Sequence, residues 1–139
     1  MCPSVAVVLV YATDSVVRDQ VRMAVGRSPA AGVDIEMFLD SDDAAEVVRA
    51  ADEGVPDLLI LDGEAWPTGG LGLCRQLKNE LASPPPTLVL IGRRDDRWLG
   101  EWSQADAVLM HPIDAHELAR AVVSLLSPAG VPATDKERT

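Results

Sequence analysis

The 139-residue chain has room for one domain and a short tail, and its 47% apolar residues are enough for a hydrophobic core. Its 12 lysines and arginines stand against 22 aspartates and glutamates, and this formal charge of -10 disfavours binding to nucleic acid or anionic lipid. The apolar runs are too short to span a membrane, and the N-terminus lacks the pattern of a signal peptide. Cys2 and Cys74 form neither a disulfide framework nor a zinc pattern, so we expect a cytoplasmic protein with reduced thiols.

The first third of the chain alternates short apolar runs with helical stripes. Residues 5–11 (VAVVLVY) predict a strand buried on both faces, and residues 15–26 predict an amphipathic helix. Residues 33–39 show a period of two, which predicts an edge strand with one wetter face. The apolar positions of that period are Val33, Ile35, Met37 and Leu39.

The middle of the chain predicts two helices around a second buried strand. The run 40–43 (DSDD) is typical of a helix start, with Asp40 or Ser41 as the N-cap. Residues 57–62 (DLLILD) predict a fully buried strand that ends on a carboxylate. A glycine-containing loop follows, and then a helix whose apolar stripe is Leu73, Cys74, Leu77 and Leu81.

The last third repeats the pattern of strand and helix. Residues 87–91 and 107–110 predict strands, and residues 95–102 predict a short helix between them. A final helix is expected over residues 114–126. We therefore expect one domain over residues 1–127 and a polar C-terminal tail over residues 128–139.

Five strands that alternate with five helices predict an α/β protein with helices on both faces of a parallel sheet. The edge character of the second strand fits the strand order 2-1-3-4-5. In that arrangement ligands gather beyond the carboxyl ends of the strands. The residues to inspect are therefore 11–14, 62–64, 91–93 and His111.

The sequence resembles the receiver domain of response regulators over about residues 5–126. The resemblance is carried by PDLLILD, which ends in Asp62, by PTLVLIG, and by ADAVLMHPIDAHEL, where the family has a lysine before a cis-linked proline. It implies a flavodoxin-like (CheY-like) three-layer sandwich with a five-stranded parallel sheet. It also implies that Asp62 is the phosphoacceptor-equivalent residue, which in the family takes a phosphoryl group from a kinase histidine with the help of Mg²⁺.

The other positions of the family's site carry different residues in this chain. The acidic pair falls on Ala12 and Thr13, and Asp14 lies one residue late, where it can cap the following helix. The Thr/Ser position falls on Ile91, and the lysine position falls on His111. Because phosphoryl transfer depends on charged groups at these positions, we predict a degenerate receiver with no catalytic residue.

The sequence leaves alternatives open at this site. Asp62 is either a residual phosphoacceptor or a structural carboxylate paired with a loop amide or with His111. His111 is either a protonation-dependent partner of Asp62 or the residue tolerated before a structural proline. Asp14, Glu64 and these two side chains meet at one sheet edge, but they lack ligand spacing, so no metal site is predicted.

Three of the five aromatic residues are tryptophans, and none falls on a core strand. Trp98 and Trp102 stand one helical turn apart on the short fourth helix, so they predict an interface anchor. The alternative is that they fold inward over the sheet. The candidate interface residues are Trp98, Leu99, Trp102, Arg94 and Arg97, and the arginines favour an acidic partner.

These observations predict a stand-alone pseudo-receiver without an output domain, which is no enzyme and uses no cofactor. It would act through phosphorylation-independent contact with a protein partner or a multi-subunit complex, as a regulatory or accessory subunit. We expect no nucleic-acid binding and no membrane insertion. The alternative is a single-domain response regulator that a sensor histidine kinase phosphorylates on Asp62 in a phosphorelay, with Mg²⁺ as cofactor.

Overall fold

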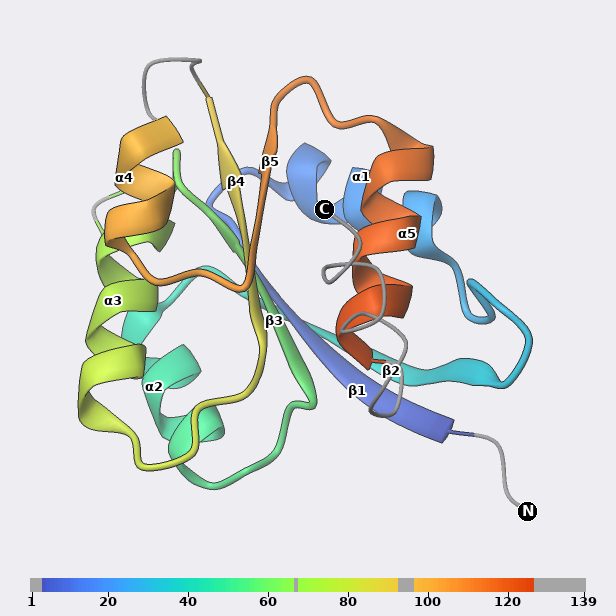
Figure 1. The fold of residues 1–139 in the computed structure, drawn as a ribbon, viewed down its shortest axis with the longest axis horizontal. Coiled ribbons are helices and arrows are strands. Elements are labelled where there is room, and N and C mark those ends of the chain that lie inside the picture. The colour runs from blue at the N-terminus through green and yellow to red at the C-terminus, as the bar shows by residue number, and fades with distance from the viewer. Residues whose placement is uncertain (1–3, 67, 93–96, 127–139) are drawn as a thin grey trace, which may run out of the picture.

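The computed structural model describes residues 4–66, 68–92 and 97–126. Strands and helices alternate along this part of the chain (Figure 1). The strands are β1 (Ser4–Tyr11), β2 (Val33–Ser41), β3 (Leu58–Asp62), β4 (Thr87–Ile91) and β5 (Ala107–Met110). The helices are α1 (Ser15–Val25), α2 (Ala44–Asp52), α3 (Gly70–Glu80), α4 (Arg97–Trp102) and α5 (Ala115–Leu126).

All the strands pair in parallel in the order β2-β1-β3-β4-β5, so the predicted sheet is confirmed. In Figure 1, α1 and α5 cover one face of the sheet, and α2, α3 and α4 cover the other. The result is the predicted three-layer sandwich. The strand order reverses between β1 and β3, and in sheets of this kind ligands bind beyond the carboxyl ends of the strands at such a point.

Two hydrophobic cores form because successive residues of a buried strand point to opposite faces. Leu58 and Ile60 of β3 pack toward α1 and α5, whereas Leu59 and Leu61 pack toward α2 and α3. Each of these side chains is fully buried, which contributes roughly 1.5–3 kcal/mol per side chain to folding. The continuous apolar character of residues 57–62 is therefore explained by burial on both faces.

The edge position of β2 is confirmed, but the predicted alternation of its side chains is wrong beyond Ile35. A bulge shifts the pairing with β1, so that Ala6 pairs with Ile35 but Val7 pairs with Met37. The extra residue reverses the faces that follow it. As a result Met37 is 47% exposed, and Phe38 packs against the core on the α1 and α5 side.

The predicted N-cap of α2 is also wrong. Asp40 and Ser41 still belong to β2, where they pair with Val10 and Tyr11 of β1, so they cannot cap the helix. The cap is Asp43, whose carboxylate accepts a hydrogen bond from the backbone of Ala45 at 2.9 Å. By contrast, the predicted capping of α1 by Asp14 is confirmed.

The predicted helix over residues 95–102 is found from Arg97, and residues 93–96 lie outside the described part of the chain. The predicted boundary between a domain over residues 1–127 and a tail over residues 128–139 also lies outside the described residues. Within the described residues, no helix is long and apolar enough to cross a membrane.

Candidate functional site at the carboxyl edge of the sheet

Asp62 lies at the carboxyl end of the central strand β3 and is only 3% exposed. Its carboxylate oxygen Oδ1 accepts a hydrogen bond from the backbone N–H of Glu64 at 3.0 Å. The same oxygen lies 3.1 Å from Nε2 of His111. Both structural partners that the sequence offered for Asp62, the loop amide and His111, are therefore present together.

His111 reaches Asp62 because it continues β5 by one residue. Its backbone N–H donates to the carbonyl oxygen of Ile91 at 2.8 Å, which extends the pairing between β4 and β5. The peptide bond to Pro112 is cis, as the family resemblance implies. The imidazole is largely buried, and it stands at the position for which the family resemblance implies a lysine.

The side chain of Thr13, at one of the positions where the family has its acidic pair, binds the backbone of Trp66. Its hydroxyl oxygen accepts a hydrogen bond from the backbone N–H of Trp66 at 2.9 Å and donates to the carbonyl of Trp66 at 3.0 Å. Thr13 therefore joins the loop after β1 to the loop after β3. The Trp66 side chain remains 77% exposed beside this clasp.

The neighbouring positions add no carboxylate to Asp62. Ala12 is fully buried and apolar, and Ile91 is buried at the end of β4. Asp14 is turned to α1, where its carboxylate accepts a hydrogen bond from the backbone N–H of Val16 at 2.9 Å. The carboxylate of Glu64 lies against Gly92 in the loop after β4, at a place that a larger side chain would fill.

Tyr11, Asp42 and Asp43 also belong to this edge, and of the three only Tyr11 was expected here, from its place at the end of the first strand. The hydroxyl of Tyr11 donates to the carbonyl of Thr68 at 2.6 Å, and its ring is buried. Burial raises the pKa of the Tyr11 phenol, and the carboxylates of Asp43, Asp42 and Asp62 raise it further. The sequence indicates the position of Tyr11 at a strand end but not its hydrogen-bond partner, because Thr68 belongs to a distant loop.

Gly70 allows α3 to begin directly against the end of β3. A Cβ atom added to Gly70 would lie 2.7 Å from the backbone oxygen of Asp62, which is too close for any side chain. Since backbone atoms press on this position, a neighbouring rotamer change cannot relieve the clash. Gly70 thus fixes the first turn of α3 over the Asp62 backbone.

Trp98 and Trp102 face solvent on α4, with exposed fractions of 65% and 44%. The guanidinium of Arg75 lies 4.6 Å from the centre of the Trp102 ring and donates a hydrogen bond to the Trp102 carbonyl at 2.6 Å. Arg75 thus supports this end of α4 from α3. Arg94 and the side chains of Leu99 and Arg97 lie outside the described part of the structure.

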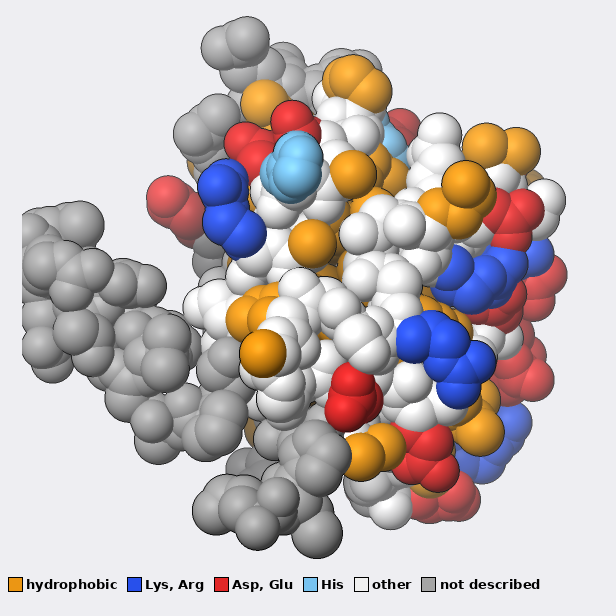
Figure 2. Space-filling model, turned by 90° about the vertical axis from the view of Figure 1, so that its right-hand side faces the viewer, with side chains coloured by type: hydrophobic (Ala, Val, Ile, Leu, Met, Phe, Trp, Pro, Cys, Tyr) orange, Lys and Arg blue, Asp and Glu red, His pale blue; other side chains and the backbone are white. Residues whose placement is uncertain are grey.

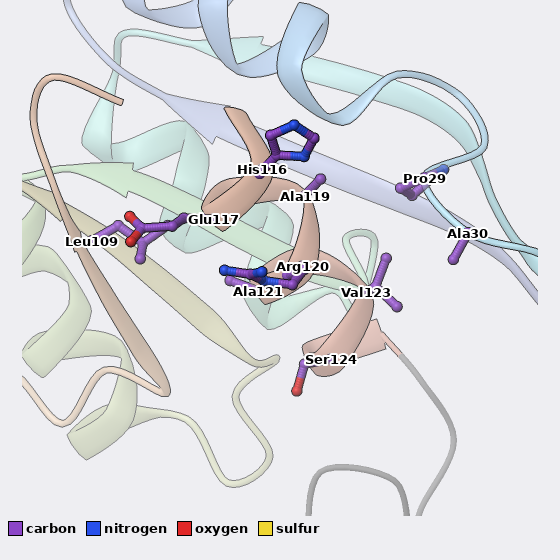
Figure 3. Close-up of a pocket in the computed structure, with 10 residues that line it drawn as sticks. All are labelled: Pro29, Ala30, Leu109, His116, Glu117, Ala119, Arg120, Ala121, Val123 and Ser124. Carbon is purple, nitrogen blue, oxygen red and sulfur yellow. The ribbon is translucent and has the colours of Figure 1, made fainter. Parts of the chain in front are cut away.

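Two hollows of similar size flank α5. One, of about 740 Å³, follows the helix itself and includes His116, Glu117 and Arg120 (Figure 3). The other, of about 680 Å³, lies between α4, β5 and α5 and includes His111. The second hollow therefore reaches the partner of Asp62.

The side of the molecule that carries α1 and α5 shows acidic and basic side chains next to one another (Figure 2). Arg22 pairs there with Asp19 and Asp40, and Arg18 lies 3.9 Å from Asp40. Hydrophobic atoms are scattered among polar ones on this face. Over the described residues, this side therefore presents no single charged or apolar patch.

A parallel sheet in this order, with a buried aspartate at the end of its central strand and a cis-proline after its last strand, is the arrangement of a signal-receiver domain. The uncharacterized response regulatory proteins MT3230 and Rv3143 of Mycobacterium tuberculosis are each 46% identical to this chain over 119 residues. The match covers 86% of this chain and 90% of each relative. The chain therefore belongs to the response-regulator receiver family of two-component signalling.

Solved structures agree with this fold. The receiver domain of Francisella response regulator 1452 has a TM-score of 0.70 at 20% identity and covers 87% of this chain and 96% of its own. The N-terminal receiver domain of a two-component response regulator from Bacteroides fragilis has a TM-score of 0.74 at 15% identity. It covers 91% of this chain and 100% of its own. No family model matches the chain.

Proposed function

We propose that this receiver acts as a pseudo-receiver: it signals through contact with a protein partner, and Asp62 is not a phosphoacceptor. The observation that carries the proposal is the state of Asp62. Its Oδ1 is held by the Glu64 amide and the His111 ring, and the residue is 3% exposed. In this role the chain is a regulatory or accessory subunit, with no catalytic activity of its own.

The surroundings of Asp62 support this proposal on energetic grounds. Phosphoryl transfer needs positive charge and hydrogen-bond donors around the transferred group, because little other catalysis is available to the protein. Removing one such donor typically costs about 10²–10³ in rate. Ile91 supplies no donor, and His111 is already engaged with Asp62, so several of these losses combine.

The donor set near Asp62 does not fit the Mg²⁺ ion that the family uses. Mg²⁺ requires hard oxygen ligands in a near-octahedral arrangement. Ala12 offers no side-chain oxygen, the Thr13 hydroxyl is bound to Trp66, and the Asp14 carboxylate caps α1. Among the described residues, no three His, Cys, Asp or Glu side chains are grouped to hold a metal. We therefore assign no step to a metal ion.

The surface that we propose for the partner is the side of the molecule formed by α4, β5 and α5. Trp98 and Trp102 are exposed on α4, and the guanidinium of Arg75, on α3, lies over the Trp102 ring. Tryptophan and arginine are enriched among the few residues that dominate the binding energy of protein interfaces. The outward position of both rings supports their role as anchors and argues against the inward alternative.

A second candidate function keeps Asp62 as the acceptor of a phosphoryl group from a sensor histidine kinase, with the conformational change read by a partner. One observation favours it: the carboxylate stands at the end of β3, at the switch point of the sheet, where the family's nucleophile lies.

A phosphorylation assay separates the two functions. The purified chain is incubated with Mg²⁺ and acetyl phosphate and analysed by intact mass spectrometry. In a working receiver, a carboxylate oxygen of Asp62 bonds to phosphorus while acetate leaves with the electrons of the broken P–O bond. We expect no added phosphoryl group, either in the chain or in the controls Asp62→Ala and Asp42→Asn.

A phosphorylated species that persists in Asp42→Asn and disappears in Asp62→Ala would refute the pseudo-receiver proposal. A well-established receiver domain run in parallel shows that the donor is active. The partner surface is tested separately by replacing Trp98 and Trp102 together with alanine. We expect loss of a co-purifying partner with an unchanged circular dichroism spectrum, and retention of that partner would exclude this surface.

A further inference from the structure

The groove between α4 and α5 has an apolar floor. It encloses about 680 Å³, which is within the range of pockets that bind small molecules. The floor residues are Ile91, Val108, Leu109, Met110 and Pro112. The β5 residues among them are only partly buried, because β5 is the last strand at this edge of the sheet in the described part of the chain. A strand with open apolar surface between two helices can accept an apolar partner.

The two walls of this groove carry negative charge. Glu101 projects from α4 and Glu117 from α5, and both side chains are exposed. Figure 3 shows Glu117 extending from α5 toward Leu109 of β5. The remaining titratable group in the lining is His111, whose ring is bound to Asp62. The described lining therefore combines an apolar floor with carboxylates on opposite sides.

We propose that this groove binds a segment of a partner protein in which lysine or arginine residues flank aliphatic ones. This inference rests on the proposed function, since it names the partner chemistry for the surface described above. The aliphatic side chains cover Val108 and Met110, and the cations lie between Glu101 and Glu117. Matching an anionic rim with cations fixes the register of a bound segment and excludes segments of the wrong charge.

This proposal differs from the expectation that the sequence alone favoured. Arg94 and Arg97 indicated an acidic partner, but an acidic segment in the groove would place its carboxylates beside Glu101 and Glu117. Repulsion between these like charges would weaken association. The charges that line the groove therefore favour a basic segment.

The test uses the full chain and three fluorescein-labelled probe peptides of equal length. One is an amphipathic peptide of leucine and lysine, the second has glutamate in place of lysine, and the third has serine in place of leucine. Binding is measured by fluorescence anisotropy at physiological ionic strength. The double variant Glu101→Gln/Glu117→Gln is compared with Glu36→Gln/Glu53→Gln, which removes the same charge from exposed positions on β2 and after α2.

We expect the leucine–lysine peptide to bind most tightly of the three. The groove variant should weaken it about five- to tenfold, and the control variant less than about twofold. Amide chemical-shift changes should cluster at residues 108–111 and 117. Equal losses in both variants, tighter binding of the glutamate peptide, or shifts confined to another face would overturn the proposal.

The failure of this inference can be distinguished from the failure of the proposed function. The binding assay contains no phosphodonor, so its result does not depend on whether Asp62 accepts a phosphoryl group. Phosphorylation of Asp62 in the mass assay would refute the pseudo-receiver while the peptide data still decide the occupant of the groove. Absence of peptide binding with an unphosphorylated Asp62 would refute the groove proposal alone.

Discussion

Asp62 and His111 hold each other in place across 49 positions of the chain, with Nε2 of the imidazole 3.1 Å from Oδ1 of the carboxylate. The carboxylate is almost fully buried, and burial without a partner would be costly. The histidine therefore stabilises a carboxylate that the fold buries at the end of its central strand.

The first prediction concerns the energy of this contact. In a double-mutant cycle of Asp62→Ala and His111→Ala, we expect a coupling of about 1–2 kcal/mol, because each single change leaves the other side chain without its partner. The measurement is the free energy of unfolding from urea titrations. The matched cycle uses His116→Ala, since His116 is exposed on α5, and it should give no coupling. Equal coupling in both cycles would contradict the prediction.

The second prediction concerns the clasp between Thr13 and the backbone of Trp66. Thr13→Val removes both hydrogen bonds of the hydroxyl and leaves its shape nearly unchanged, so we expect a loss of about 1–2 kcal/mol in the free energy of unfolding. Thr13→Ser keeps the hydroxyl and should recover most of that loss. If the valine and serine variants are equally stable, the clasp contributes nothing.

The third prediction compares two glycines of α3. In Gly70→Ala the new Cβ would meet the backbone of Asp62, and we expect a loss of about 1–3 kcal/mol. At Gly72 an added Cβ meets nothing within 4 Å, so Gly72→Ala should stabilise the protein by about 0.5–1 kcal/mol through helix propensity. Thermal unfolding of both variants provides the measurement, and a stabilised Gly70→Ala variant would show that α3 does not press on β3.

The fourth prediction concerns pH. The pKa of Tyr11 is raised in the folded state by burial and by Asp43, Asp42 and Asp62. Between its ordinary value of 10.0 and this higher value, the folded state keeps a proton that the unfolded state has lost. The stabilisation is therefore complete below pH 10.0, and it is lost as the pH rises toward the folded-state pKa.

This titration can be read directly, because Tyr11 is the single tyrosine of the chain. Its ionisation is followed by the ultraviolet absorbance of tyrosinate. We expect Asp43→Asn, which preserves a capping side chain, to lower the pKa of Tyr11 toward its ordinary value. Asp52→Asn, a charge change at the end of α2, should leave the titration in place. If Asp43→Asn leaves the pKa of Tyr11 unchanged, the Asp43 carboxylate does not act on the phenol, and the prediction is contradicted.

The fold could be predicted from the sequence because strands that are buried on both faces appear there as continuous apolar runs. The apolar runs that became β1, β3 and β4 are continuous since both faces of each strand are covered by helices. The failures have equally local causes. A one-residue bulge in β2 reversed the faces of Met37 and Phe38, and strand pairing as far as Ser41 moved the cap of α2 to Asp43.

The site was harder to predict than the fold. The topology alone predicted that Asp62 and His111 lie near each other. Asp62 is the last residue of β3 and His111 directly follows β5, and these strands end at the same edge of the sheet. The hydroxyl of Thr13 and the phenol of Tyr11 bind backbone atoms 53 and 57 positions away. A bond between a side chain and a distant carbonyl leaves no periodic trace in a sequence, so these contacts became visible only in three dimensions.

The bulge in β2 also affects whether copies of this protein can associate through the edge of the sheet. An edge strand offers unpaired backbone groups that another chain can extend into a larger sheet, the first step of aggregation. In β2 the ladder is broken in its middle, and Asp34 and Glu36 place carboxylates beside the break. A second copy that tried to add a strand here would meet both a kinked template and charges of its own sign, so this edge protects the protein against stacking into fibres.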